Sequence, residues 1–175
     1  TADNWGTFCY LRDVANGAFW SAAHQPTLKP ADRFEAVFSE ARAEFRSRTH
    51  QIESHIEIAV SPEDDVELRR LRLTNSSRNR RTIEVTSYAE VALAAPAAEA
   101  LHPAFSNLFV QTEIVRDQRA ILCTRRPRSR GEASPWMFHL LAPHGASAGS
   151  ALSYETDRLR FLGRGRTPAD PLAMR

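Results

Sequence analysis

The stretch Tyr154–Arg166, with the sequence YETDRLRFLGRGR, holds the densest pairing of acidic residues and arginines in the chain. Arginine grips carboxylates and sugar hydroxyls through a planar fork of donors, so this stretch has the chemistry of a ligand rim. The same side chains make an ion-pair latch that closes a sheet if they bind one another instead. The latch is the commoner outcome, because surface arginines and acids pair routinely without a ligand. Gly163 and Gly165 free the backbone for a tight bend.

Motifs for catalysis or metal binding are missing from the sequence. A serine nucleophile would show as GxSxG, and neither Cys9 nor Cys123 has a histidine close in sequence. A metal site would show as clustered ligands, but no HxH or HExxH occurs among the six histidines. The segment Gly163–Arg166 (GRGR) lacks the lysine and the spacing of a phosphate-binding Walker loop. We therefore expect no catalytic residue, no metal and no cofactor in this chain.

Some acids and tryptophans invite a carbohydrate interpretation. Glu84 and Glu90 lie in one predicted strand, six positions apart, which separates them by roughly 20 Å at ~3.3 Å per residue. Acid–base work on a glycoside needs carboxylates that flank one bond, so we interpret this pair as surface residues. Trp20 and Trp136 could stack on sugar rings, although tryptophan in a β-sandwich is more often buried.

The segment Arg116–Arg130 is rich in arginine and carries Asp117 as its one acid. Nucleic-acid binders usually interleave aromatic residues or belong to strongly basic domains, and the net charge here is only +2. We interpret this segment as a solvated loop, or as one that docks on an acidic neighbouring domain.

The elements that carry these residues are predicted to be strands, because the dominant hydrophobic period is two. In Gln51–Val60 the residues Ile52 and Ile56 alternate with Glu53 and Glu57. This alternation is typical of an antiparallel sheet with one buried and one wet face. Further strands are predicted at Thr7–Arg12, Gly17–Ser21, Arg33–Phe38, Arg42–Thr49, Val66–Thr74, Arg81–Leu93, Asn107–Arg116, Arg119–Arg125 and Pro135–Ala142.

The remaining segments complete an all-β fold. Val66–Thr74 changes phase at Arg69–Arg70, which predicts a β-bulge. Tyr154–Arg166 is predicted as two short strands, and the alanine-rich Ala94–Phe105 as one helical turn at most. Nearly every connection suits a hairpin, so we predict an antiparallel sandwich or barrel of about ten to twelve strands.

Length and composition set the class of protein. A chain of 175 residues, 42% hydrophobic and 25% charged, is long enough for one soluble globular domain and short for two. No apolar run approaches the ~20 residues that span a bilayer, and no secretion signal is visible. Cys9 and Cys123 lie in apolar runs, which favours buried thiols in a reducing cytoplasm. The chain runs from TADNWG to DPLAMR, which suggests a fragment of a larger multidomain protein.

The amino-acid sequences of several segments resemble those of a known family. These segments occur in the order WGTFCYLRD, GAFWSAAHQP, VSPEDDVELRRLRLTN, IEVTSYAEVAL, HPAFSNLFVQTE, TRRPRS and YETDRLRFLGRGR. The series resembles cyclic β-1,2-glucan synthases, and within them the cellobiose-phosphorylase-like β-sandwich modules of the glycosyltransferase family 36 type. The resemblance covers nearly the whole chain, from Asp3 to Arg166.

The resemblance implies a galactose-mutarotase-like β-supersandwich over residues 1–175, truncated relative to the family module. In that family the module precedes a helical barrel that holds the catalytic aspartate, so this chain is expected to be non-catalytic by itself. The parent enzyme makes β-1,2-glucan from UDP-glucose, and its phosphorylase-like part sets chain length. The expected location is therefore the cytoplasmic face of the bacterial inner membrane, within a membrane-bound parent.

The expected role is to bind or position a β-1,2-glucan or another gluco-oligosaccharide, or to dock the helical barrel. A truncated sandwich exposes a sheet edge, through which we expect a homodimer to be able to form. The candidate carbohydrate-binding residues combine a motif match with sugar-binding side chains. They are Arg12, Asp13, Trp20, Tyr154, Glu155, Asp157, Arg158, Arg164 and Arg166.

Other functions fit the same residues. An aldose mutarotase-like enzyme would use a histidine acid, His102 or His139, and a glutamate base, Glu113 or Glu155. A purely structural interdomain spacer would instead bury its acids and arginines in ion pairs. The expected spacer pairs are Asp157–Arg158 and Glu155–Arg164.

Overall fold

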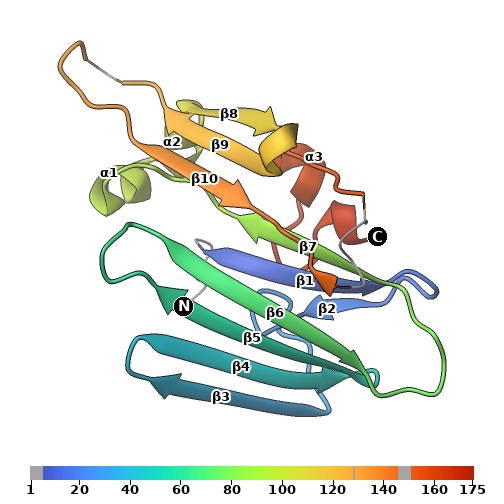
Figure 1. The fold of residues 1–175 in the computed structure, drawn as a ribbon. Coiled ribbons are helices and arrows are strands. Elements are labelled where there is room, and N and C mark those ends of the chain that lie inside the picture. Colours follow the sequence, from blue (N-terminus) through green and yellow to red (C-terminus); the bar gives the residue numbers. More distant parts are fainter. Residues whose placement is uncertain (1–5, 128, 146–150) are drawn as a thin grey trace. The chain divides into compact units, whose positions relative to one another are not determined.

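The computed structural model describes residues 6–127, 129–145 and 151–175. Antiparallel strands dominate it, which confirms the prediction of an all-β class (Figure 1). Contacts between Cα atoms divide the chain into two compact units. Unit 1 comprises Thr1–Thr7 and Ala89–Phe161, and unit 2 comprises Phe8–Tyr88 and Leu162–Arg175.

A four-stranded antiparallel sheet forms the largest part of unit 2. Its strands follow one another in sequence order, from β3 at one edge to β6 at the other (Figure 1). Short turns allow this order, because each strand pairs with the next along the chain. The strands are β3 (Arg33–Ser39), β4 (Arg42–Thr49), β5 (Ile52–Val60) and β6 (Glu67–Asn75).

The predicted β-bulge in β6 is wrong. β5 and β6 pair one to one from Ile52↔Asn75 to Val60↔Glu67, with no extra residue at Arg69–Arg70. The change of hydrophobic phase has a simpler cause: Leu68 is 68% exposed and lies on the outer face. Sequence phase alone therefore does not separate a bulge from an exposed leucine.

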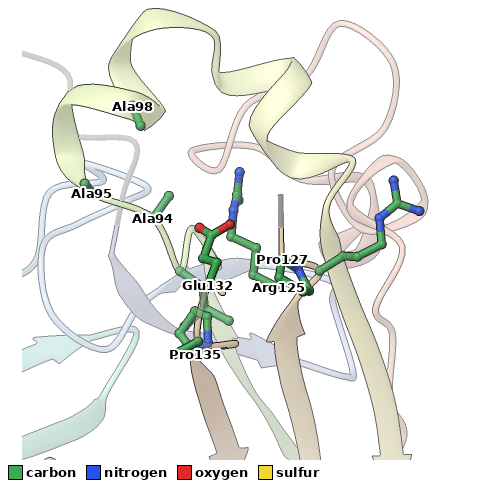
Figure 2. Close-up of a pocket in the computed structure, with 10 residues that line it drawn as sticks. Ala94, Ala95, Ala98, Arg125, Pro127, Glu132 and Pro135 are labelled. Atoms are coloured by element: carbon green, nitrogen blue, oxygen red, sulfur yellow. The ribbon is translucent and has the colours of Figure 1, made fainter. Parts of the chain in front are cut away.

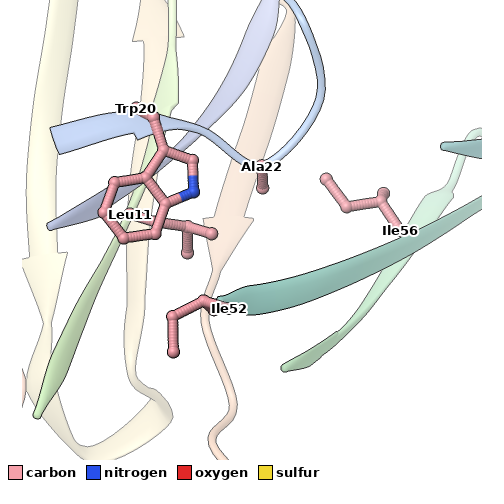
Figure 3. Close-up of a cluster of buried hydrophobic side chains, with 5 residues drawn as sticks. All are labelled: Leu11, Trp20, Ala22, Ile52 and Ile56. Carbon is pink, nitrogen blue, oxygen red and sulfur yellow. The ribbon is translucent and has the colours of Figure 1, made fainter. Parts of the chain in front are cut away.

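A smaller sheet in the order β2-β1-β7 packs against the four-stranded sheet. Its strands are β1 (Thr7–Asp13), β2 (Phe19–Ser21) and β7 (Ile83–Ala89). The core of unit 2 lies between the two sheets and includes Leu11, Trp20, Ala22, Ile52 and Ile56 (Figure 3). Residues from β1 and β2 meet residues from β5 there, so the core depends on contacts far apart in sequence.

Two serines inside this core are hydrogen-bonded. Ser47 on β4 and Ser54 on β5 lie opposite each other, with their Oγ atoms 2.8 Å apart. Both hydroxyls also donate to the Ala22 carbonyl, at 3.3 and 2.8 Å. A buried polar group that is hydrogen-bonded avoids most of the desolvation cost, which explains serines on an inward face.

Unit 1 contains a three-stranded sheet in the order β10-β9-β8. Its strands are β8 (Val110–Val115), β9 (Ala120–Arg125) and β10 (Trp136–Leu140). A short 3-10 helix, η1 (Arg116–Gln118), connects β8 to β9, which confirms the hairpin predicted around that point. Two short helices, α1 (Pro96–Leu101) and α2 (Pro103–Asn107), precede the sheet.

The predicted strands in Tyr154–Arg166 are wrong, because this segment contains the helix α3 (Arg158–Leu162). The Asp157 carboxylate caps the helix, since its Oδ1 accepts the N–H groups of Leu159 and Arg160 at 2.8 and 3.2 Å. Gly163 follows with φ +87°, as expected for a glycine that ends a helix. The chain then closes with the 3-10 helix η3 (Leu172–Met174).

No helix in the described ranges is long and apolar enough to cross a membrane. The longest of them, α1, has six residues.

Candidate functional site

The nine candidate residues fall into both units, so each set is described in its own unit. Unit 2 holds Arg12, Asp13, Trp20, Arg164 and Arg166. Unit 1 holds Tyr154, Glu155, Asp157 and Arg158.

Asp13 lies at the end of β1 and is only 1% exposed. Its carboxylate accepts the backbone N–H of Ala15 at 3.0 Å and forms an ion pair with Arg81. The Ala15 N–H and the Arg81 guanidinium hold the pKa of this carboxyl below its ordinary value, against the opposing effect of burial. Arg81 also donates to the His50 carbonyl at 3.1 Å, so the pair ties β1 to two other segments. Neither oxygen of Asp13 faces solvent.

Arg12 is the neighbouring candidate and points to the other face of β1. Its Nη1 lies 3.3 Å from Glu84 on β7, in a pair that is largely exposed. This ion pair also explains Glu84, which the sequence placed on the surface.

The part of the Tyr154–Arg166 stretch that lies in unit 1 forms ion pairs. Arg158 binds Glu90 at 2.6 Å, and Asp157 lies 3.7 Å from Arg160 rather than pairing with Arg158. Glu155 accepts the N–H of Asp157 at 2.8 Å. These contacts latch the segment around α3, as the sequence favoured, although the helix changes which residues meet.

The other candidates of this stretch differ in their surroundings. The guanidinium of Arg116 lies over the Tyr154 ring, 5.5 Å from its centroid. Arg166 pairs with Asp170 at 3.0 Å, whereas Arg164 is exposed on the surface of unit 2.

Trp20 borders a pocket of about 270 Å³ on unit 2. We call it the Trp20 pocket; its lining residues are Trp20, Ser21, Ala23, His24, Lys29, Pro30, Ala31, Phe34 and Thr49. Trp20 itself is 2% exposed and belongs to the core, so it forms the floor. The aromatic rings of His24 and Phe34 lie 6.0 Å apart and are exposed. An exposed phenyl ring beside hydrogen-bonding groups is the kind of surface on which a sugar ring stacks.

Lys29 supplies positive charge at the Trp20 pocket. Its Nζ donates to the Phe19 carbonyl at 2.6 Å and lies 3.4 Å from the centroid of the Phe19 ring. Partial burial lowers the pKa of Lys29, and the charge of Asp170 opposes that shift. The pocket therefore lies within electrostatic range of the Arg166–Asp170 ion pair at the end of the chain.

A second pocket of about 410 Å³ lies in unit 1. Figure 2 shows Arg125 and Glu132 on one side of it, with Ala94, Ala95 and Ala98 facing them. Arg125 is 5% exposed, and its Nη1 donates to the carbonyls of Ala92 and Ser106, both at 3.1 Å. None of the described residues that line this pocket is aromatic. The Trp20 pocket is thus better suited to a sugar ring.

Glu44, His55 and Glu57 cluster on the outer face of the four-stranded sheet, with their ligand atoms within 4.8 Å. Cationic side chains already occupy these atoms. Glu44 pairs with Arg42 and Arg46, both at 2.9 Å, and Glu57 pairs with Arg70. A metal ion would have to displace these guanidinium groups, so the cluster does not fit a metal site. It is an ion-pair lattice that joins β4, β5 and β6.

This lattice predicts a loss of stability in acid. The hydrogen bond from His55 and the neighbouring arginines lower the pKa of Glu44 below its ordinary value of 4.5. A carboxyl group whose pKa is lower in the folded chain than in the unfolded chain stabilises the fold above pH 4.5. This contribution is lost as the pH falls through the folded-state pKa. We expect Glu44→Gln to reduce the dependence of unfolding free energy on pH between 5 and 3, measured by urea titration.

The matched control is Glu63→Gln, in the exposed turn before β6. This variant should keep the wild-type pH dependence, because the Glu63 side chain is exposed and lies outside the ion-pair lattice. Equal pH profiles for Glu44→Gln and the wild type would contradict the assignment.

Of the residues considered for a mutarotase-like enzyme, Glu113 and His139 lie on the sheet of unit 1. Glu113 pairs with Leu122, and His139 pairs with Ile121. Side chains of adjacent residues in a strand point to opposite faces, so Glu113 and His139 lie on opposite sides of this sheet.

Sequence reasoning missed the other residues of the Trp20 pocket. His24 and Lys29 lie in a proline-containing loop, and Phe34 lies in the predicted strand Arg33–Phe38. A signal was present, since Lys29 is the only lysine in an arginine-rich chain. Its meaning depended on knowing which strand the loop covers.

The two packed antiparallel sheets of unit 2 define a β-sandwich. The chain belongs to the family described as glycosyl hydrolase 94, supersandwich domain, whose sequence model matches residues 1–175. This result confirms both the predicted fold class and the family resemblance.

Three known proteins contain a region that is similar in sequence to this chain. Cyclic beta-(1,2)-glucan synthase NdvB of Rhizobium meliloti (strain 1021) is 40% identical over 171 residues, which are 98% of this chain and 6% of that protein. Solabiose phosphorylase of Paenibacillus borealis is 25% identical over 89% of this chain and 19% of its own length. N,N'-diacetylchitobiose phosphorylase of Vibrio proteolyticus is 25% identical over 99% of this chain and 21% of its own length. The chain thus spans a small part of each relative.

Proposed function

We propose that this chain is a non-catalytic carbohydrate-positioning module of a cyclic β-1,2-glucan synthase. The single observation that carries the proposal is the 40% identity to a glucan synthase over 98% of the chain. The phosphorylase relatives act on sugars by their names, which agrees with a carbohydrate-associated role. The parent protein would lie at the cytoplasmic face of the bacterial inner membrane, and a helical barrel would neighbour this module.

The Trp20 pocket is the site that best supports sugar binding. Phe34 is 44% exposed and offers a ring face, while His24 and Lys29 offer polar groups at the same opening. Sugars bind through such combinations, because ring C–H groups pack on an aromatic face and hydroxyls take hydrogen bonds. Trp20 is the predicted candidate that lines this pocket.

The proposal predicts that Phe34→Ala weakens binding of β-1,2-linked gluco-oligosaccharides at least roughly fivefold, since one stacking contact is lost. The measurement is an NMR or calorimetric titration of the 175-residue chain, with a cellulose-derived series as the linkage control. Wild-type chain should bind the β-1,2 series saturably.

Phe38→Ala is the matched control variant. Phe38 lies on the same strand and the same face as Phe34, is 74% exposed, and does not line the Trp20 pocket. It should leave the dissociation constant unchanged. No binding of the wild-type chain at millimolar sugar would overturn the binding role. Equal losses of sugar affinity in Phe34→Ala and Phe38→Ala would mean that the sugar does not bind at the Trp20 pocket.

A structural role is the second candidate, and the pairing of the predicted residues favours it. Asp13, Asp157, Arg158 and Arg166 all bind other groups of the chain rather than facing a common cleft within their units. In that case the chain would act as a spacer or as a docking surface for the helical barrel. The sugar titration separates the two candidates, because a spacer binds neither series.

A further inference from the structure

Among the residues that the structure describes, no strand lies beside β3 at one edge of the four-stranded sheet (Figure 1). The strand β3 pairs with β4 without a break over Arg33–Ser39, and all of its residues are exposed. Natural proteins usually protect such an edge with charges, prolines or bulges. β3 has neither a proline nor a bulge, and its charged residues are Arg33 and Glu35.

The hairpin between β3 and β4 decides which backbone groups face this free edge. Its two-residue loop makes Ser39 and Arg42 the hydrogen-bonded pair that closes the hairpin. Bonds to β4 then recur at every second residue of β3. The N–H and C=O groups of the alternate residues, Phe34, Ala36 and Phe38, therefore point outward and are ready to bind another strand.

We propose that the β3 edge pairs antiparallel with the β3 edge of a second copy of this chain, with the two-fold axis at Ala36. Ala36 directs its backbone groups outward, so this axis falls on a hydrogen-bonded pair. The opposed pairs are Ala36 with Ala36, Phe34 with Phe38, Glu35 with Val37, and Arg33 with Ser39. No like charges face each other in this register.

The side chains of β3 favour this register. Phe34 and Phe38 are 44% and 74% exposed, and both contact Phe45 of β4, with ring centroids 6.4 and 6.0 Å apart. Two copies would bring Phe34 of each against Phe38 of the other, around the small Ala36 residues. Cross-strand aromatic pairs stabilise antiparallel sheets, and here they would cover apolar surface that is otherwise wet.

The opposite edge of the sheet, β6, does not offer the same match. A two-fold axis at Leu71 would set Arg70 against Arg72 twice. Like charges directly opposite each other destabilise a strand pair. The arginines therefore oppose self-pairing of β6 in this register. Self-pairing of β3 does not require sugar binding, but it covers Phe34 and so competes with a sugar at the Trp20 pocket.

The test is sedimentation velocity of the wild-type chain and of charge variants over roughly 1–200 μM, the range in which modest interfaces dissociate. We expect a wild-type dimer. Ala36→Lys places two ammonium groups at the two-fold axis and should raise the dissociation constant at least about tenfold. Val37→Lys adds the same charge one residue away, opposite Glu35, and should leave the dimer intact or tighten it.

A cross-link checks the register independently. Cα atoms of a hydrogen-bonded antiparallel pair lie about 5.5 Å apart, which suits a disulfide, so Ala36→Cys should form a covalent dimer on mild oxidation. Val37→Cys should not, because Val37 faces Glu35 rather than its own copy. Burial raises the pKa of Cys9 to about 12 and also raises that of Cys123, so the native thiols stay protonated at neutral pH.

Far-UV circular dichroism of each variant confirms that the fold is kept. A wild-type chain that is monomeric throughout the range would overturn the proposal. So would a dimer that survives Ala36→Lys without cross-linking through Ala36→Cys, since that dimer would use another surface, such as the exposed Trp136 and Phe138 of β10.

Discussion

Replacing Trp20 by alanine is expected to lower the free energy of unfolding by roughly 3–5 kcal/mol. The indole is 2% exposed and packs with Leu11, Ala22, Ile52 and Ile56 between the two sheets of unit 2 (Figure 3). Truncation removes buried apolar surface and leaves a cavity that the β-strands around it cannot collapse to fill. Urea denaturation followed by far-UV circular dichroism measures the loss.

Trp136, which lies outside this core, supplies the control. Trp136 on β10 is 66% exposed, so Trp136→Ala should change the free energy of unfolding by less than about 1 kcal/mol. Similar losses in the two variants would mean that Trp20 is not a core residue. The expected instability also makes Trp20→Ala a poor probe of sugar binding, which is why Phe34→Ala tests the pocket.

Replacing Arg81 by methionine is expected to cost roughly 3–5 kcal/mol, because the Asp13 carboxylate would stay buried without its cation. The side chains of Arg81 and Asp13 are only 17% and 2% exposed. Methionine keeps much of the apolar stem, so the loss reports the guanidinium. The measurement is again urea denaturation at neutral pH.

Measuring the free energy of unfolding over a series of pH values tests the direction of this effect. The pKa of Asp13 is lowered from its ordinary value of 3.8, so the pair stabilises the fold above that pH and loses its effect as the pH falls through the lower folded value. The difference between wild type and Arg81→Met should therefore shrink in acid.

Arg12→Met is the matched control, on the strand that carries Asp13, since the side chains of Arg12 and Glu84 in its ion pair are 27% and 44% exposed. Exposed pairs contribute about 0–1 kcal/mol, and this variant should lose no more. An Arg81→Met variant as stable as Arg12→Met would contradict the assignment of a buried pair.

Sequence pattern predicted the strands β4 and β5 well because each has buried residues on its inner face. The strand β4 has the bounds that the alternation predicted, Arg42–Thr49, and β5 begins one residue later than predicted, at Ile52. Successive side chains of a strand point to opposite faces, so burial of one face requires an apolar residue at every second position of the sequence. The hairpin β8–β9 followed for the same reason.

The segment Tyr154–Arg166 shows where pattern was insufficient. Leu159, Phe161 and Leu162 fit a short strand as readily as one helical turn, because so few residues do not distinguish the two periods. The signals that did decide it were local: Asp157 before the turn and Gly163 after it are a helix cap and a helix end.

The sequence by itself determined the class of fold, the family and the absence of catalytic motifs, since these depend on local periodicity and on ordered motifs. Only the tertiary structure decided which charged residues are internal ion pairs and which face solvent. Asp13 and Arg164 look equally suited to a ligand in sequence, yet Asp13 is buried against Arg81 and Arg164 is exposed. The physical reason is that the partner of Asp13 lies 68 residues away, and strand pairing alone brings the two together.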